Sequence, residues 1–147
     1  AHWHEVYRTK RKTSSGQPSG ALVRYTAPLR PQGRALELGA SNGDDALWLA
    51  RQGWQVLGAD ISEVAMARAT QTAATAGLSD KVRFEARDLA QGLPKGPFEL
   101  VTALFFQSSE TEFPRTRLLG EAAALVASCR SSALGPTRMA RTFGAVV

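Results

Sequence analysis

The sequence contains little cysteine and no long hydrophobic run, and each absence limits what the chain can be. Its single cysteine, Cys129, cannot form a disulfide within the chain. No stretch approaches the roughly 18 to 20 consecutive apolar residues that a membrane-spanning helix needs. The first residues also do not have the pattern of a secretory signal. We therefore expect a cytoplasmic protein with no membrane segment.

The overall composition is that of an ordinary folded domain. Apolar residues make up 44% and charged residues 21% of the 147 positions, which excludes the disordered, collagen-like and disulfide-scaffold classes. A chain of this length can bury roughly two thirds of its unfolded surface. We therefore expect residues 1–147 to form one domain.

Charge is distributed unevenly along the chain. Residues 1–34 carry seven basic residues and one acidic residue, residues 35–127 carry eight and twelve, and residues 128–147 carry three and none. This pattern divides the domain into a basic N-terminal segment (1–33), a core (34–127) and an atypical tail (128–147). The basic cluster at 8–12 could contact RNA phosphates. Because no aromatic residues are interleaved with it, it is more typical of a solvated loop, and nucleic acid is not an expected partner.

The hydrophobic periodicity of the core alternates between strands and helices. Short apolar runs predict buried strands at 34–38, 54–60, 82–86 and 98–104, and apolar residues three and four apart predict helices between them and after Pro114. Such an alternation is typical of an α/β fold, here a Rossmann-like three-layer sandwich with a mostly parallel sheet. In these sheets ligands bind at the carboxyl ends of the strands.

Candidate ligand-binding residues follow three of the predicted strands. After the first strand, small residues allow backbone N–H groups and a helix N-terminus to approach a ligand. Asp60 ends the second strand, where a carboxylate can accept both hydroxyl groups of an adenosine ribose, although it could instead simply cap the next helix. Asp88 and Leu89 follow the third strand and could hold the edge and face of an adenine. The candidates at the first turn are Glu37, Gly39, Ala40, Ser41 and Gly43.

The first turn distinguishes between two adenosine-containing cofactors. A dinucleotide site has the pattern Gly-x-Gly-x-x-Gly, and here Ser41 and Asp44 occupy its second and third glycine positions. An acidic residue at the start of the helix would also repel a pyrophosphate. S-adenosylmethionine carries a sulfonium cation and no phosphate, so the acidic residues Glu37, Asp44 and Asp45 are compatible with it. The turn therefore favours S-adenosylmethionine over NAD.

The stretch RALELGASNGDDALWLARQGWQVLGADIS, residues 34–62, resembles the first and second motifs of class I S-adenosylmethionine-dependent methyltransferases. It is most similar to the small bacterial group related to tellurite-resistance and thiopurine methyltransferases. The similarity extends back through Trp3, Tyr7, Gly16 and Pro18, and forward through FEARDL and FELVTALFF to about residue 127.

This resemblance implies a role for each candidate. The residues at the first turn, Glu37, Gly39, Ser41 and Gly43, match the motif that surrounds the methionine part of the cofactor. Asp60 and Ile61 match the ribose and adenine contacts, and Asp88 and Leu89 match the adenine-edge position. The segment from Thr102 to Gln107 matches the wall between the methyl group and the acceptor, although its Phe105 and Phe106 are also typical packing residues.

The sequence departs from the family at two places. Ser41 replaces a glycine, and its side chain could crowd the cofactor tail or hydrogen-bond to it. From Ser128 the sequence SCRSSALGPTRMAR has no strand pattern where the family continues to a seven-stranded sheet. We therefore expect the fold to be incomplete on its C-terminal side, through a truncation or a reading-frame change. The fourth strand would then be an exposed edge, open to a short strand at 143–147 or to homodimer formation.

The predicted function is transfer of a methyl group to a small-molecule acceptor. A sulfur atom or a metalloid oxyanion needs little help from a general base, and no catalytic residue is identified. The alternatives are a catalytically impaired adenosyl-binding remnant and an NAD-dependent oxidoreductase. His2 and His4 could bind a metal, but no further cluster supports a site, so we expect terminal disorder there and no metal.

Overall fold

A computed structural model of the chain describes residues 2–10, 13–31, 33–104, 106 and 113–128. Within these ranges the chain forms a four-stranded sheet flanked by helices. The strands are β1 (Arg34–Leu38), β2 (Gln55–Asp60), β3 (Val82–Ala86) and β4 (Leu100–Thr102), in the order β3-β2-β1-β4. All three strand pairs are parallel, with Glu37 of β1 opposite Gly58 of β2 and Thr102 of β4. The predicted parallel sheet is thus confirmed.

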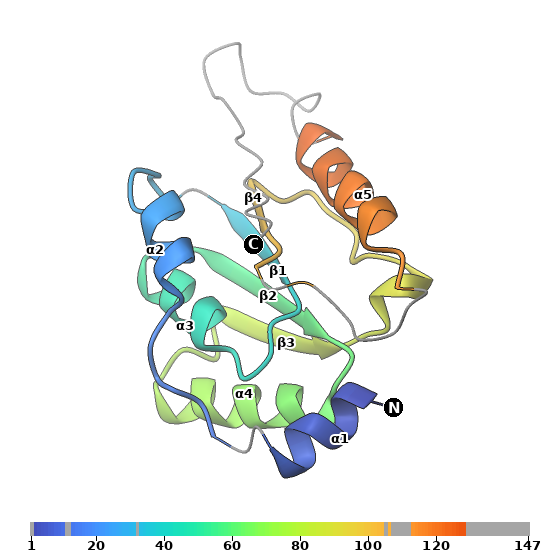
Figure 1. The fold of residues 1–147 in the computed structure, drawn as a ribbon. Coiled ribbons are helices and arrows are strands. Elements are labelled where there is room, and N and C mark those ends of the chain that lie inside the picture. The colour runs from blue at the N-terminus through green and yellow to red at the C-terminus, as the bar shows by residue number, and fades with distance from the viewer. Residues whose placement is uncertain (1, 11–12, 32, 105, 107–112, 129–147) are drawn as a thin grey trace.

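The helices form layers on both faces of the sheet (Figure 1). They are α1 (His2–Thr9), α2 (Gly20–Thr26), α3 (Asp44–Arg51), α4 (Glu63–Thr75) and α5 (Arg115–Ser128), with a short 3₁₀ helix at Leu89–Gln91. One core joins α2, α3 and α4 to the sheet face that carries Ala35, Val56 and Leu100. A second core joins α5 to the opposite face, which carries Leu36 and Val101. These layers confirm the predicted Rossmann-like sandwich.

Local signals in the sequence set the ends of the central helices. The Ser62 hydroxyl accepts the Ala65 N–H at the start of α4, as expected of a serine N-cap. Gly43 precedes α3 with a φ of 85°. A Cβ at Gly43 would lie 2.8 Å from Phe84 Cζ and 2.9 Å from Ala69 Cβ. Glycine is therefore required at Gly43 both by the backbone conformation and by the packing of α3 against its neighbours.

Two elements differ from the prediction, and the causes are tertiary. His2 and His4 lie in helix α1 rather than in a disordered terminus. α1 packs against α4, where Arg68 Nη1 donates a hydrogen bond of 2.7 Å to the Tyr7 carbonyl. The fourth strand is shorter than the apolar run that predicted it, because only residues 100–102 pair with β1. Phe105, Gln107, Cys129 and the tail strand predicted at 143–147 lie outside the described residues.

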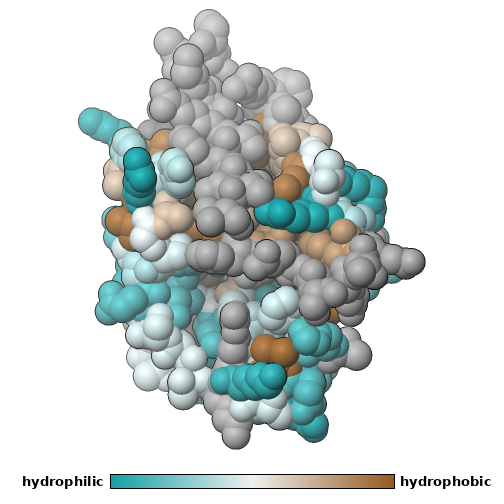
Figure 2. Space-filling view, in the orientation of Figure 1, coloured by the Kyte–Doolittle hydropathy of each residue, from teal (hydrophilic) through white to brown (hydrophobic). Residues whose placement is uncertain are grey.

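On the face seen in Figure 2, hydrophilic side chains predominate among the described residues, with hydrophobic patches between them. Among the described residues, the large hydrophobic side chains that are exposed are Tyr25 and Ile61, at 43% and 42%. No helix in the described ranges is both long and apolar enough to cross a membrane.

Candidate cofactor site

A cavity of about 810 Å³ lies at the carboxyl ends of the strands, where parallel α/β sheets bind ligands. Its volume lies within the usual range for small-molecule sites, about 300 to 1,000 Å³. Of the ten predicted binding residues, eight line it: Glu37, Gly39, Ala40, Ser41, Asp60, Ile61, Asp88 and Leu89. Gly43 and Thr102 do not, since Gly43, the N-cap of α3, packs against Phe84 and Ala69, and Thr102 is buried in the sheet beside Glu37.

The turn between β1 and α3 forms one wall of the cavity. The N–H groups of Gly39 and Ala40 both donate to the Ala59 carbonyl, at 2.8 and 3.0 Å, and the Gly43 N–H donates to the Ala40 carbonyl at 2.9 Å. Gly39 has a φ of 73° and Ser41 a φ of 54°. These hydrogen bonds fix the turn against the end of β2.

Asp60 lies next to this turn and is 7% exposed. Its Oδ2 accepts the Ser41 N–H and its Oδ1 accepts the Ser62 N–H, each at 3.0 Å. An ionised carboxylate has about four acceptor positions, so bracing the turn is compatible with accepting ligand hydroxyl groups. Asp60 therefore combines the helix-start role and the cavity-lining role that the sequence left open.

The far end of the cavity carries Asp88 and two apolar side chains. The Asp88 carboxylate accepts the Ala90 N–H at 3.0 Å and lies on the surface of the cavity. Leu89 is buried, whereas Ile61 is exposed although it follows the buried Asp60. An exposed isoleucine on a cavity wall leaves apolar area that a flat ring could cover. Arg87 lines the same end, and its guanidinium contacts Glu85 Oε1 at 2.5 Å.

Glu37 lies at the centre of the site and is almost fully buried. Burial raises the pKa of its carboxyl well above the ordinary value, and the neighbouring charges of Asp45 and Asp60 raise it further, while a hydrogen bond from the Ala46 backbone opposes the change. Glu37 Oε2 is buried without a hydrogen bond among the described residues, as is Oγ1 of Thr102 opposite it. An unpaired buried acceptor is costly, and a cationic or N–H-bearing ligand group would satisfy it.

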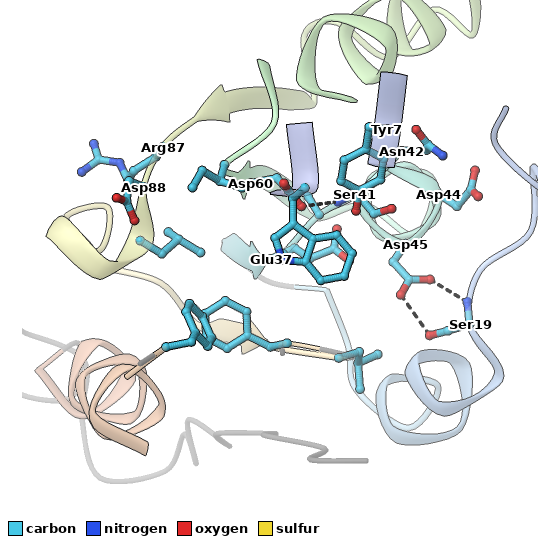
Figure 3. A pocket seen from close by; sticks show the side chains of 18 of the residues that line it. Tyr7, Ser19, Glu37, Ser41, Asn42, Asp44, Asp45, Asp60, Arg87 and Asp88 are labelled. Atoms are coloured by element: carbon cyan, nitrogen blue, oxygen red, sulfur yellow. Dashed lines mark hydrogen bonds between the residues drawn. The ribbon is translucent and has the colours of Figure 1, made fainter. Parts of the chain in front are cut away.

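The acidic residues at the start of α3 hold the N-terminal segment. Asp44 accepts hydrogen bonds from the hydroxyls of Ser14 and Ser15 and from two backbone N–H groups of that segment. Asp45 accepts the Ser19 N–H at 2.6 Å and the Ser19 hydroxyl at 2.9 Å (Figure 3). Burial raises the pKa of Asp45, and the two bonds from Ser19 oppose that change. These two carboxylates therefore position residues 14–19 along the cavity as well as adding negative charge to it.

Aromatic side chains complete the lining, and sequence reasoning gave them little weight. Trp3 and Tyr7 of α1, together with Phe106 and Phe113, border the cavity. The Phe106 and Phe113 rings meet edge to face, with centroids 5.2 Å apart. For the N-terminal part of this wall, the indication in the sequence was the similarity of Trp3, Tyr7 and Pro18 to the methyltransferase group. Nothing in the local sequence indicated Phe113.

The residues present fit S-adenosylmethionine. The described lining holds five carboxylates and one guanidinium, which is already ion-paired. Such a lining suits a cation and disfavours a pyrophosphate. Glu37 offers a buried acceptor without a partner, and Ile61 and Leu89 offer apolar area. Among the described residues no group of three or more histidine, cysteine, aspartate or glutamate residues is arranged to hold a metal ion.

Comparison with known proteins agrees with this geometry. The family model described as "Methyltransferase domain" matches residues 35–128. Ribosomal RNA small subunit methyltransferase C from Alcanivorax borkumensis is 38% identical over 50 residues, which are 34% of this chain and 15% of that protein. A solved structure concerned with the conversion of a disulfide bond into a thioacetal group during echinomycin biosynthesis is 28% identical. It has a TM-score of 0.67 over 85% of this chain and 55% of its own.

The fold and site define a Rossmann-like methyltransferase domain of class I. Magnesium protoporphyrin IX methyltransferase from Synechocystis PCC 6803, solved with bound S-adenosylmethionine, shares this fold with a TM-score of 0.60 at 19% identity, over 86% of this chain and 69% of its own. Since the family model covers more than half of the chain, the chain belongs to the methyltransferase domain family. It spans 15% of the ribosomal RNA methyltransferase and 55% of the echinomycin-related structure.

Proposed function

We propose that this domain binds S-adenosylmethionine and transfers its methyl group to a small neutral acceptor. The observation that carries the proposal is the acid-lined cavity at the carboxyl ends of the strands, which includes Asp60, Glu37 and the exposed Ile61. When bound, the cofactor supplies an electrophilic methyl group on a sulfonium centre. The role of the chain is to hold that group and the acceptor in one orientation, a contribution that can lower a barrier by about 7 to 11 kcal/mol.

Each part of the lining has a task in this proposal. Asp60 would accept hydrogen bonds from the ribose hydroxyls, and Asp88 would accept one from the edge of the adenine. Ile61 and Leu89 would cover the faces of the adenine ring. Glu37 would accept a hydrogen bond from the ammonium group of the methionine part. The aromatic side chains of α1 and of Phe106 and Phe113 would exclude water from the acceptor side.

The charge of the cavity supports a neutral acceptor, such as a thiol, over a metalloid oxyanion. Five carboxylates line the described part, and the guanidinium of Arg87 is engaged by Glu85. An oxyanion would therefore meet like charges at close range. We also propose kinship with the tellurite-resistance and thiopurine methyltransferase group. The N-terminal residues Trp3, Tyr7 and Pro18, which carry that similarity, all line the cavity and so support the assignment.

A ligand titration followed by an activity assay tests this proposal. Ligand at 100 times its dissociation constant adds about 2.7 kcal/mol to stability, so S-adenosylmethionine and S-adenosylhomocysteine should each raise Tm by roughly 5 to 10 °C, and NAD should not. Release of S-adenosylhomocysteine should then depend on an added thiol and not on an added oxyanion. A Tm response to NAD alone would contradict the proposal.

A second copy of the chain is a further proposed partner. In the described sheet β4 is an edge strand, and unpaired edge groups favour strand pairing. We propose a homodimer through this edge. Sedimentation velocity would support it with a dimer mass and contradict it with a monomer mass across the working concentration range.

A further inference from the structure

Ser41 has an unusual backbone conformation. With a φ of 54°, it is the one non-glycine residue of the described chain with a positive φ. Serine in this left-handed region is strained, and such strain tends to persist where the surrounding structure enforces it and function uses it. Glycine would adopt the same conformation without strain. A functional role for the hydroxymethyl group would explain why a serine, and not a glycine, is present at this position.

The surroundings fix the position of this residue. Its N–H donates to Asp60 Oδ2 at 3.0 Å, and the turn before it is anchored on the Ala59 carbonyl. The backbone therefore cannot rotate to relieve the strain without breaking these bonds. The Ser41 side chain lines the cavity, and its hydroxyl makes no hydrogen bond to the described residues.

The order of residues along the cavity indicates which part of a ligand Ser41 would meet. In Figure 3, Asp88 lies at one end and Asp45 at the other, with Asp60 between them and Ser41 on the side of Asp60 away from Asp88. If the adenosine spans Asp88 to Asp60, the part of the ligand beyond Asp60 is its amino-acid tail. Ser41 therefore lies toward the tail end.

The charges at this end make a neutral donor valuable. The tail carries a carboxylate as well as an ammonium group, and the carboxylates of Asp44 and Asp45, which line this end, would repel the tail carboxylate. A ligand carboxylate among protein carboxylates needs hydrogen-bond donors, and a serine hydroxyl supplies one without adding charge. A glycine at the same position would have no side-chain donor.

We propose that the Ser41 hydroxyl donates a hydrogen bond to the carboxylate of the cofactor tail and so selects ligands that carry the complete amino-acid group. This inference rests on the proposed function. It makes Ser41 a specificity-determining residue, and it explains why a strained serine is kept at this position.

Calorimetric titration of two variants with two ligands tests the inference. S-adenosylhomocysteine carries the amino-acid tail, whereas 5′-methylthioadenosine ends in a methyl group on sulfur. A hydrogen bond to a charged group contributes about 1.5 to 3 kcal/mol, so Ser41→Ala and Ser41→Gly should each bind S-adenosylhomocysteine at least about tenfold more weakly. Both variants should bind 5′-methylthioadenosine as the natural chain does. Ser79→Ala, a surface change next to Asp80, serves as the matched control.

Thermal unfolding separates a binding role from a structural one. Because glycine relieves the strain, Ser41→Gly should melt a few degrees above Ser41→Ala while losing the same affinity. Unchanged S-adenosylhomocysteine affinity in both variants, or an equal loss for both ligands, would overturn the inference. If the natural chain binds neither ligand, the proposed function fails instead, so the two failures are distinguishable.

Discussion

Asp60 braces the turn and lines the cavity, so its replacement should affect both stability and binding. Asp60→Ala removes the acceptors for the Ser41 and Ser62 N–H groups along with the proposed ribose contact. We expect a lower Tm and an affinity for S-adenosylhomocysteine that is weaker by about 10 to 100-fold, from the loss of charge-assisted hydrogen bonds. Isothermal titration calorimetry measures the affinity, with Asp80→Ala as a control on an exposed acid. Unchanged affinity in Asp60→Ala would contradict the ribose assignment.

Glu37 should make the stability of the protein depend on pH. Since burial raises its pKa in the folded state, the folded chain keeps a proton that the unfolded chain loses above about pH 4.5. The free energy of unfolding should therefore fall as pH rises from that value toward the raised pKa. Glu37→Gln removes this contribution.

Urea denaturation of the natural chain and of Glu37→Gln at several pH values measures the difference. The variant should show a shallower decline and greater stability at neutral pH. Some decline should remain, because burial also raises the pKa of Asp45. Identical pH dependence in the two proteins would mean that Glu37 ionises as freely in the folded chain as in the unfolded one.

At the scale of elements, the packing of α3 depends on Gly43. Gly43→Ala would place a Cβ within 3 Å of Phe84 and Ala69 and force alanine to a φ of 85°. We expect a loss of roughly 2 to 4 kcal/mol in the free energy of unfolding, from overpacking and backbone strain together. Gly77→Ala is the matched control, because its φ is 70° but its Cβ would meet open space.

The comparison of these two variants isolates the packing contribution. Gly77→Ala should cost only the strain, about 1 to 2 kcal/mol. Chemical denaturation provides both values. Equal losses in the two variants would show that the close approach of α3 to β3 is not what requires glycine at Gly43.

Elements defined by local patterns were predictable from the sequence, whereas elements defined by distant contacts were not. β1 and β2 follow short apolar runs, and their observed bounds, Arg34–Leu38 and Gln55–Asp60, agree with the predicted 34–38 and 54–60 to within one residue. α1 has weak local signals, and its position depends on Arg68, which is 61 residues away from Tyr7. The contacts of Asp44 with Ser14 and Ser15 likewise join residues about 30 apart.

At the scale of the whole molecule, topology explains why most of the site could be predicted. Parallel strands bring their carboxyl ends to one edge of the sheet, so residues after β1, β2 and β3 gather without further information. The aromatic wall could not be derived this way. Trp3 and Phe113 reach the same cavity from the two ends of the described chain, through packing that no single stretch of sequence contains.

Because residues from both ends of the described chain line the cavity, ligand binding should affect the stability of the whole domain. Trp3 and Pro114 border the same space, so a ligand resting there would connect the first helix to the last described one. Any unfolding that releases α1 or the start of α5 would lose contacts with the ligand, so ligand binding would oppose it. Occupancy would therefore slow the exchange of amide hydrogens throughout the sheet, including in strands the ligand never touches.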